Sequence, residues 1–196
     1  MQLFKKKEHL NTRVKETGRG GKVDWTPLVE ACRGGDRRAQ KRIYDLLSGK
    51  MFAVCLRYMD SREAAEDILQ DGFVTLFTKL DSYSGEGSFE GWARKIFVNT
   101  ALMSLRKNDV LRQTEDVDEA WDITADTPTA IENIGYSELM KMIASMPPGF
   151  RTVFNMYVIE GYSHKEIAES LGISEATSRS QLQRARTMLQ NKIKTY

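Results

Sequence analysis

Residues 162–189, YSHKEIAESLGISEATSRSQLQRARTML, set the architecture of the carboxy-terminal part of the chain. An apolar stripe at helical spacing runs through the first half of this segment and consists of Ile167, Ala168 and Leu171. Gly172 then provides a helix stop, and the hydroxyl of Ser174 provides a cap for a second helix. The segment therefore predicts two short helices joined by a tight turn, which is the helix-turn-helix arrangement.

The second helix of this pair has two different sides when its residues are placed about 100° apart. Its inner side consists of Ser178, Leu182, Ala185 and Leu189. Its outer side consists of Ala176, Ser180, Gln183, Arg184 and Thr187, flanked by Arg179 and Arg186. Arg, Gln and Ser present the donors and acceptors that read base edges in the DNA major groove. The outer side is therefore predicted to bind duplex DNA, and a solvated amphipathic helix pair is the alternative interpretation.

Composition indicates a globular protein. The chain has 196 residues and 41% hydrophobic content, enough for packed cores without disulfides. Cys32 and Cys55 stand inside apolar helical patterns and not at paired spacing, which is typical of reduced core thiols. No apolar run approaches the roughly 20 residues that a membrane helix needs, and the first residues lack the apolar core of a signal peptide. We expect a soluble, cytoplasmic protein.

The net charge of +2 conceals strong segregation along the chain. Residues 1–22 carry +5, residues 23–108 carry +1, residues 109–138 carry −8 and residues 139–196 carry +4. The distribution indicates a basic arm, an acidic connector and a basic carboxy-terminal unit, which favours nucleic acid as a partner.

The periodicity predicts an all-α protein, because apolar residues recur at spacings of three and four and no period-two alternation is sustained. We expect two small helical domains joined by an acidic flexible linker, the second containing the helix-turn-helix. The predicted boundaries are a disordered basic arm over 1–23, a first domain over 24–107, the linker over 108–135 and the second domain over 136–196.

A long helix is predicted from a cap at Asp60 or Ser61 to about Leu80. Its core stripe consists of Ala65, Leu69, Phe73, Leu76 and Leu80. A second strip on the same helix is acidic and consists of Glu63, Asp67, Gln70, Asp71, Val74 and Thr78. This acidic strip is either a solvated face or a docking surface for a basic partner helix, and the sequence leaves both interpretations open.

The next predicted features are the loop DSYSGEGS, residues 81–88, and a helix that begins at Phe89 with Ser88 as its cap. The loop is expected to leave Tyr83 accessible. One apolar side of the helix consists of Phe89, Trp92, Ala93, Ile96 and Met103, and the opposite one of Val98, Leu102 and Leu105. Between them runs a polar track of Lys95, Asn99 and Arg106. Cations beside aromatic rings suit single-stranded nucleic acid, so the track is predicted to bind a single strand. In the alternative interpretation, Trp92 is simply a core residue.

Together these segments resemble the extracytoplasmic-function sigma factors, the smallest members of the bacterial primary-sigma superfamily. The resemblance covers nearly all of residues 25–195. It depends on the order and spacing of AEDILQDGFVTLF at 65–77, GSFEGWARKIFVNTALMSLRK at 87–107 and the helix-turn-helix. Two positions depart from the family pattern, because Ser104 stands where the family often has Asp and Ser178 where it often has Val.

The resemblance implies partners and residue roles. It implies binding to the clamp helices and flap of RNA polymerase core, the clamp contacts being Asp67, Gln70 and Asp71. It implies melting and recognition of the minus-ten promoter element by Ser82, Tyr83, Trp92, Lys95, Asn99 and Arg106. It implies recognition of the minus-thirty-five element by Ser174, Glu175, Arg179, Ser180, Gln183, Arg184 and Arg186. It further implies an anti-sigma protein as partner, often tethered to the inner membrane.

The sequence disfavours two other function classes. A stand-alone, dimeric helix-turn-helix regulator would bind a palindrome but would leave the acidic strip and the polar track unexplained. An enzyme is disfavoured, because neither His9 nor His164 has a Cys or second His placed for a nucleophile or metal arrangement. The glycines at 18, 20 and 21 follow no strand and do not form a phosphate loop. We therefore expect no catalytic residue, cofactor, metal or small-molecule substrate.

Overall fold

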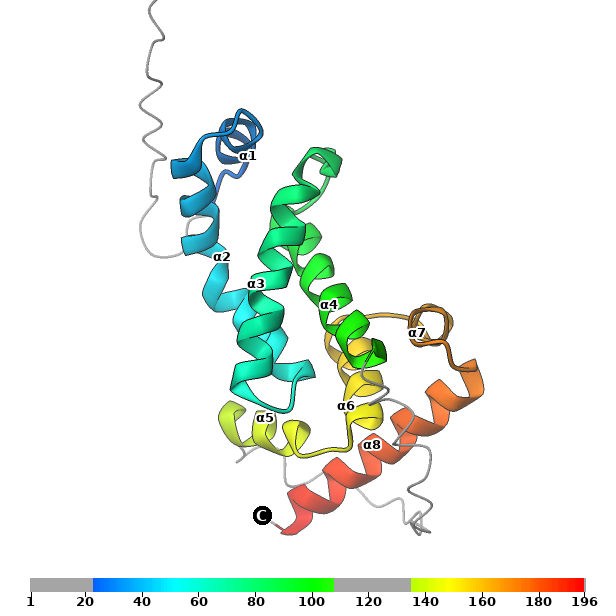
Figure 1. Ribbon diagram of the computed structural model, residues 1–196. Helices are drawn as coiled ribbons and strands as arrows, with labels where there is room; N and C mark the ends of the chain where they lie inside the picture. The colour runs from blue at the N-terminus through cyan, green and yellow to red at the C-terminus, as the bar shows by residue number, and fades with distance from the viewer. Residues whose placement is uncertain (1–22, 108–134, 196) are drawn as a thin grey trace, which may run out of the picture.

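The computed structural model describes residues 23–107 and 135–195, and all regular structure within these ranges is helical. The all-α prediction is therefore confirmed for the part of the chain that the structure describes (Figure 1). The predicted basic arm lies outside the described residues except for Val23, and the predicted acidic linker lies outside them except for Gly135.

The first helical unit contains four α-helices and a 3-10 turn among its described residues. These elements are α1 (Thr26–Arg33), α2 (Arg37–Tyr58), α3 (Arg62–Thr78), η1 (Leu80–Ser82) and α4 (Phe89–Lys107). Sequence signals fix their ends, since the Asp36 carboxylate accepts from the Arg38 N–H at 2.7 Å and the Ser61 hydroxyl accepts from the Ala64 N–H at 3.1 Å. Helices α2, α3 and α4 pack against one another around an apolar interior (Figure 1).

Aromatic rings fill the interior of this first unit. Phe97 on α4 is completely buried, and its ring meets that of Phe73 on α3 edge to face, with 5.0 Å between centroids. Gly72 makes this approach possible, because a Cβ at that position would lie 2.3 Å from the Phe97 ring. The close packing of α3 on α4 therefore requires glycine at this point in the helix.

The predicted faces of α3 and α4 are correct in outline, with two differences. Ile68 is buried and takes the central core position beside Leu69, which is only partly buried. Met103 was predicted to lie on an apolar side of α4, but its side chain is 68% exposed. The prediction for Met103 is therefore wrong, because the helical period assigns a residue to a face but does not determine whether another helix covers that face.

The second helical unit begins at residue 135. Its elements are α5 (Tyr136–Ala144), α6 (Pro148–Phe154), the π-helical turn η4 (Asn155–Ile159), α7 (His164–Leu171) and α8 (Glu175–Thr195). Gly172 ends α7 with a positive φ of 70°, and the Thr177 N–H donates to the Ser174 hydroxyl at 2.9 Å. The predicted helix-turn-helix is therefore present as α7 and α8.

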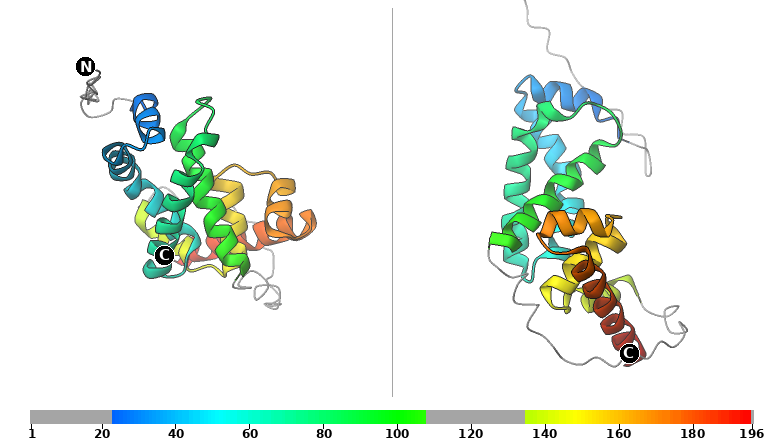
Figure 2. Two further views of the ribbon diagram at one scale, coloured as in Figure 1. Left: turned by 45° about the horizontal axis from the view of Figure 1, so that its top comes forward. Right: turned by 90° about the vertical axis from the view of Figure 1, so that its right-hand side faces the viewer.

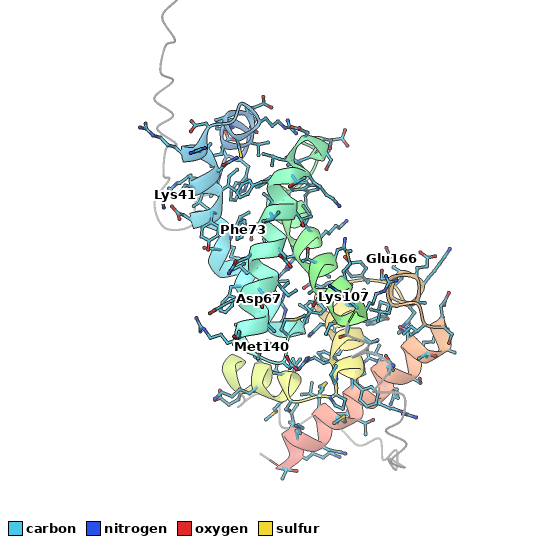
Figure 3. The ribbon with its side chains drawn as sticks, viewed as in Figure 1. Lys41, Asp67, Phe73, Lys107, Met140 and Glu166 are labelled. Atoms are coloured by element: carbon cyan, nitrogen blue, oxygen red, sulfur yellow. The ribbon has the colours of Figure 1, made fainter. Side chains whose placement is uncertain are left out.

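The two units touch each other. Helices α5 and α6 contact α2, and α7 contacts α4 (Figure 2). In Figure 3, α7, marked by Glu166, lies beside the end of α4, marked by Lys107. The helix that was predicted to handle melted DNA is therefore in contact with the helix-turn-helix of the same chain.

Candidate nucleic-acid interface

The acidic strip of α3 points away from the core. All six predicted members are exposed: Glu63, Asp67, Gln70, Asp71, Val74 and Thr78. Asp67 marks this face in Figure 3. Within the described residues neither Asp67 nor Asp71 takes part in an ion pair, whereas the neighbouring Glu66 accepts from Arg62 at 2.8 Å. The strip therefore presents unneutralised carboxylates beside an exposed valine, which suits a protein partner with a basic surface.

The loop over residues 81–88 differs from the prediction at its aromatic residue. Tyr83 is only 9% exposed, its ring packs on Phe89 and Trp92, and its hydroxyl donates to the Gly87 carbonyl at 3.1 Å. The predicted accessibility of Tyr83 is wrong, because turn chemistry describes the backbone and not the ring that can fold back under it. Ser82 is exposed. Trp92 is partly buried against the core, in line with the alternative interpretation.

Arg33 at the end of α1 binds the start of this loop. Nothing in the sequence indicated this contact. Its guanidinium donates to the Leu80 carbonyl at 3.2 Å and also to the Tyr83 carbonyl, and it lies 3.8 Å from an Asp81 carboxylate oxygen. Two residues of the loop, Asp81 and Tyr83, and the preceding Leu80 are thus tied to the last turn of α1. Such a clamp preorganises the loop before any partner arrives.

The polar track of α4 is exposed at all three predicted positions, Lys95, Asn99 and Arg106. Two of its cations face α7. Arg106 donates to the Ser170 carbonyl at 3.3 Å. Hydrogen bonds from the backbone N–H and hydroxyl of Ser163 lower the pKa of Glu166, and the nearby charge of Lys95 lowers that pKa further. The track and the helix-turn-helix therefore attract each other electrostatically.

The predicted major-groove residues lie on α8 and on Ser174, which directly precedes it. Ser174, Arg179, Ser180, Gln183 and Arg186 are exposed, and Glu175 and Arg184 are half-buried. The cations are held within their own unit. Arg179 pairs with Glu175 at 2.6 Å, while the guanidinium carbons of Arg184 and Arg186 lie 6.0 Å and 5.9 Å from the ring centroids of Phe150 and Tyr157. This face is ordered by local contacts and remains open to a duplex.

Ser178 is fully buried on the inner side of α8, where an apolar residue would have been simpler to pack. Its hydroxyl lies 2.9 Å from Nδ1 of His164, whose ring stacks on Tyr157 with 4.5 Å between centroids. Burial lowers the pKa of His164, and the positive charges of Arg179 and Arg186 lower it further. The sequence hinted at this pair only through the polar residue at an apolar position.

A polar seam joins the two units. Arg57 on α2 pairs with Glu160 at 2.9 Å, and Arg94 on α4 reaches the other oxygen of the same carboxylate at 3.4 Å. Arg151 donates to the Tyr58 carbonyl at 3.0 Å, and Asn155 donates to the Arg57 carbonyl at 2.7 Å. The Glu160 carboxylate is only 4% exposed, so the two units share a buried ion pair.

The seam is incompletely satisfied. Among the described residues, the buried side-chain atoms without a hydrogen-bond partner are Arg57 Nε, Tyr58 Oη, Arg151 Nε, Thr152 Oγ1 and Asn155 Oδ1. All five belong to residues of α2, α6 and η4, the elements that carry the seam. Each buried unpaired polar atom costs about 1–3 kcal/mol of stability. The contact between the units is therefore weaker than its extent suggests.

Sequence comparisons match both units to one family. The family model for Sigma-70 region 2 matches residues 43–110, and that for Sigma-70, region 4 matches residues 136–189. The ECF RNA polymerase sigma-E factor of Haemophilus influenzae is 30% identical over 177 residues, which cover 85% of this chain and 93% of that protein. This chain belongs to the ECF sigma factors. The sigma-E factor of Escherichia coli K12 is 28% identical over 177 residues, 85% of this chain and 92% of that protein.

Solved structures of similar proteins are also sigma factors. The sigma factor RpoE, solved with the anti-sigma factor NepR from Bartonella quintana, aligns with 79% of this chain and 96% of its own at 22% identity and a TM-score of 0.49. CnrH, solved with the cytosolic domain of CnrY, aligns with 86% of this chain and 96% of its own at 19% identity and a TM-score of 0.47. The family assignment rests on the sequence matches, which also disfavour the stand-alone regulator.

The described residues of this ECF sigma factor offer neither a metal site nor a reactive thiol. Within residues 23–107 and 135–195, no cluster of His, Cys, Asp and Glu is suited to a metal ion. Both thiols are buried and free, and burial raises the pKa of Cys55 to about 12. A raised pKa leaves little thiolate, so neither cysteine has the features of a nucleophile. None of the helices in the described part of the chain is long and apolar enough to cross a membrane.

Proposed function

We propose that this ECF sigma factor binds RNA polymerase core and directs it to promoters, with its two units reading two separated DNA elements. The observation that carries the proposal is the pair of family matches, Sigma-70 region 2 on the first unit and region 4 on the second, in that order along one chain. A regulator with one helix-turn-helix would have no use for the first of these regions.

The acidic strip of α3 is proposed to dock on the clamp helices of the polymerase, with Asp67, Gln70 and Asp71 as contacts. Their exposure and the lack of ion pairs at both aspartates in the described residues support this role. Carboxylates on such a surface contribute orientation and association rate more than affinity. The second unit is proposed to contact the flap.

The minus-ten element is proposed to bind along the loop and the polar track. Ser82, Lys95, Asn99 and Arg106 are exposed and offer hydrogen bonds and charge to a single strand. Trp92 presents part of its ring. Tyr83 is proposed to support the loop from below and not to stack on a base, because its ring and hydroxyl are both engaged. Unstacked bases gain protein contacts that offset an unpairing cost of a few kcal/mol.

The minus-thirty-five element is proposed to bind the outer face of α8 in the major groove. The contacts are Ser174, Glu175, Arg179, Ser180, Gln183, Arg184 and Arg186. The order imposed on Arg184 and Arg186 by the Phe150 and Tyr157 rings supports this role, since a guanidinium already held in place loses less freedom on binding.

Three further properties belong to the same proposal. The chain works in the cytoplasm, where the polymerase is, and catalyses no reaction itself. An anti-sigma protein, membrane-tethered or free, holds it inactive. The solved complexes of RpoE with NepR and of CnrH with the cytosolic domain of CnrY are what suggests such a partner.

Reconstituted transcription tests the proposal. The purified chain is mixed with polymerase core, and comigration together with promoter-specific transcripts is expected. Asp67→Asn should weaken core binding, whereas Glu66→Gln, which removes the same charge from the same helix outside the strip, should not. Tight binding to a palindromic duplex without core, and no initiation with it, would support the regulator instead.

A further inference from the structure

The carboxylate of Glu160 identifies an anion site on the first unit. Its two oxygens pair with two different helices, Arg57 of α2 at 2.9 Å and Arg94 of α4 at 3.4 Å. Arg57 is largely buried and its Nε has no hydrogen-bond partner among the described residues. Two guanidinium groups that converge on a pair of oxygens form the arrangement that proteins use for carboxylate and for phosphate alike.

A hollow of about 390 Å³ adjoins the two arginines on the first unit. It is lined by Lys50, Met51, Ala53, Arg57, Ser88, Glu90, Gly91 and Arg94. Its wall includes the start of α4, directly after the loop over residues 81–88. Lys50 contributes a third cation there, although it is paired with Glu90 at 2.7 Å. The site is therefore basic, open and continuous with the segment proposed to hold melted DNA.

Groups of the second unit interact with three cations of α4. Glu160 pairs with Arg94, the charge of Lys95 acts on Glu166, and Arg106 donates to the Ser170 carbonyl. Lys95 and Arg106 lie on one face of α4, and Arg94 lies about 100° away around the helix. Helix α7, marked by Glu166 in Figure 3, contacts α4. Several cations along one helix suit a polymer of phosphates better than a single small anion.

We propose that Arg57 and Arg94 form a binding site for a phosphate group of promoter DNA, and that Glu160 occupies this site while the two units are in contact. The proposal rests on the function proposed above. Separation of the units removes the carboxylate and releases both guanidinium groups to the DNA backbone. Polymerase, which must hold the two units at two promoter elements, then also uncovers the site.

The test measures the affinity of the full-length chain for a fluorescent single-stranded oligonucleotide. Binding is followed by the fluorescence anisotropy of the oligonucleotide, in the absence of polymerase. Glu160→Gln keeps the shape of the side chain and removes its charge, and it should tighten binding by about fivefold, the size expected for loss of one competing ion pair. Glu169→Gln is the matched control, because Glu169 is exposed on α7 and the variant has the same net charge. Adding Arg94→Gln to Glu160→Gln should abolish the gain.

Equal affinities of the Glu160→Gln and Glu169→Gln variants would overturn the proposal, as would a gain that survives Arg94→Gln. A gain for inorganic phosphate but not for the oligonucleotide would also overturn it, since the site would then serve a small anion. Transcription by the unsubstituted chain with core is measured in parallel. Its failure would refute the proposed function, whereas normal initiation with no difference between the two variants would refute only the phosphate site.

A second measurement leaves Glu160 in place, in case its substitution disturbs folding. Dyes are attached at Arg37→Cys and Gln190→Cys, one in each unit, while the buried Cys32 and Cys55 stay unlabelled. The oligonucleotide should lengthen the distance between the dyes, and inorganic phosphate at equal ionic strength should not. Oligonucleotide binding at an unchanged distance would overturn the proposal.

Discussion

The interior of the first unit and the seam between the two units are built on different principles. In the interior, Phe73 and Phe97 meet edge to face and the surrounding positions are aliphatic. The charged and polar side chains that are buried or largely buried in the seam are those of Arg57, Arg151, Asn155 and Glu160. Among the described residues of α2, α6 and η4, five buried side-chain atoms, Tyr58 Oη included, have no hydrogen-bond partner. Both regions bury apolar side chains in one continuous cluster, and the seam adds buried charged and polar groups to it.

This difference indicates that the interior of the first unit is the more permanent contact and that the seam is the more easily opened one. Apolar surface buried at about 25 cal/mol per Å² is lost only by unfolding. A buried ion pair roughly balances its own desolvation, so the seam can open when a partner offers its groups better bonds. Substitutions in the interior and in the seam should therefore change the free energy of unfolding by different amounts and even with opposite signs.

The largest expected effect is in the interior. Phe97→Ala removes a completely buried ring, and unfolding by denaturant should show a loss of about 3–5 kcal/mol. Met103→Ala is the control on the same helix, because that side chain is 68% exposed and its loss should stay within about 0.5 kcal/mol. Similar losses for both variants would contradict the packing described for α4.

Gly72→Ala should cause the next largest loss of stability. The new Cβ would lie 2.3 Å from the Phe97 ring, and overpacking of this kind costs about 1–3 kcal/mol. Gly49→Ala is the matched control in α2, where nothing lies within 4 Å of a new Cβ. Alanine is the better helix former, so that control should gain up to about 1 kcal/mol. Thermal melts of both variants at one pH test the opposite signs.

A smaller loss is expected on acidification through His164. Its pKa in the folded chain is lowered from the ordinary 6.5, chiefly by burial, so the unfolded chain takes up this proton first as the pH falls. The stability it contributes is therefore present above pH 6.5 and is lost as the pH falls toward the lowered value. Melting temperatures between pH 7.5 and 5.5 should fall, and less so in His164→Gln. An identical slope in both proteins would contradict the assignment.

The smallest effect, with the reverse sign, is expected in the seam. Thr152→Val removes a buried hydroxyl that has no partner among the described residues, so stability should be unchanged or rise by less than about 1 kcal/mol. Thr100→Val in α4 removes a hydroxyl that donates to the Ile96 carbonyl at 2.9 Å and should lose about 0.5–1.5 kcal/mol. A larger loss at Thr152 than at Thr100 would break the comparison between seam and interior.

Local chemistry was readable from the sequence. The helix ends at Ser61, Ser88, Gly172 and Ser174 follow capping rules, and the exposure of the α3 strip follows the helical period. Contacts between distant segments were not readable. The burial of Tyr83 under its own loop, the grip of Arg33 on that loop and the ion pair of Glu160 each depend on which helices meet. Periodicity assigns a residue to a face and leaves the neighbour of that face undetermined.

The π-helical turn η4 determines where Glu160 points. The Glu160 N–H donates to the Asn155 carbonyl five residues back at 3.0 Å, and both residues reach α2 across the seam. In an ordinary α-helix five residues advance by about 1.4 turns, which would aim the two side chains in different directions. Regularising this turn into an α-helix with all its residues kept would therefore separate the two side chains by about 140°. Deletion of a single residue would instead leave them four apart, about 40° from each other, so the extra residue and the π-helical geometry compensate each other.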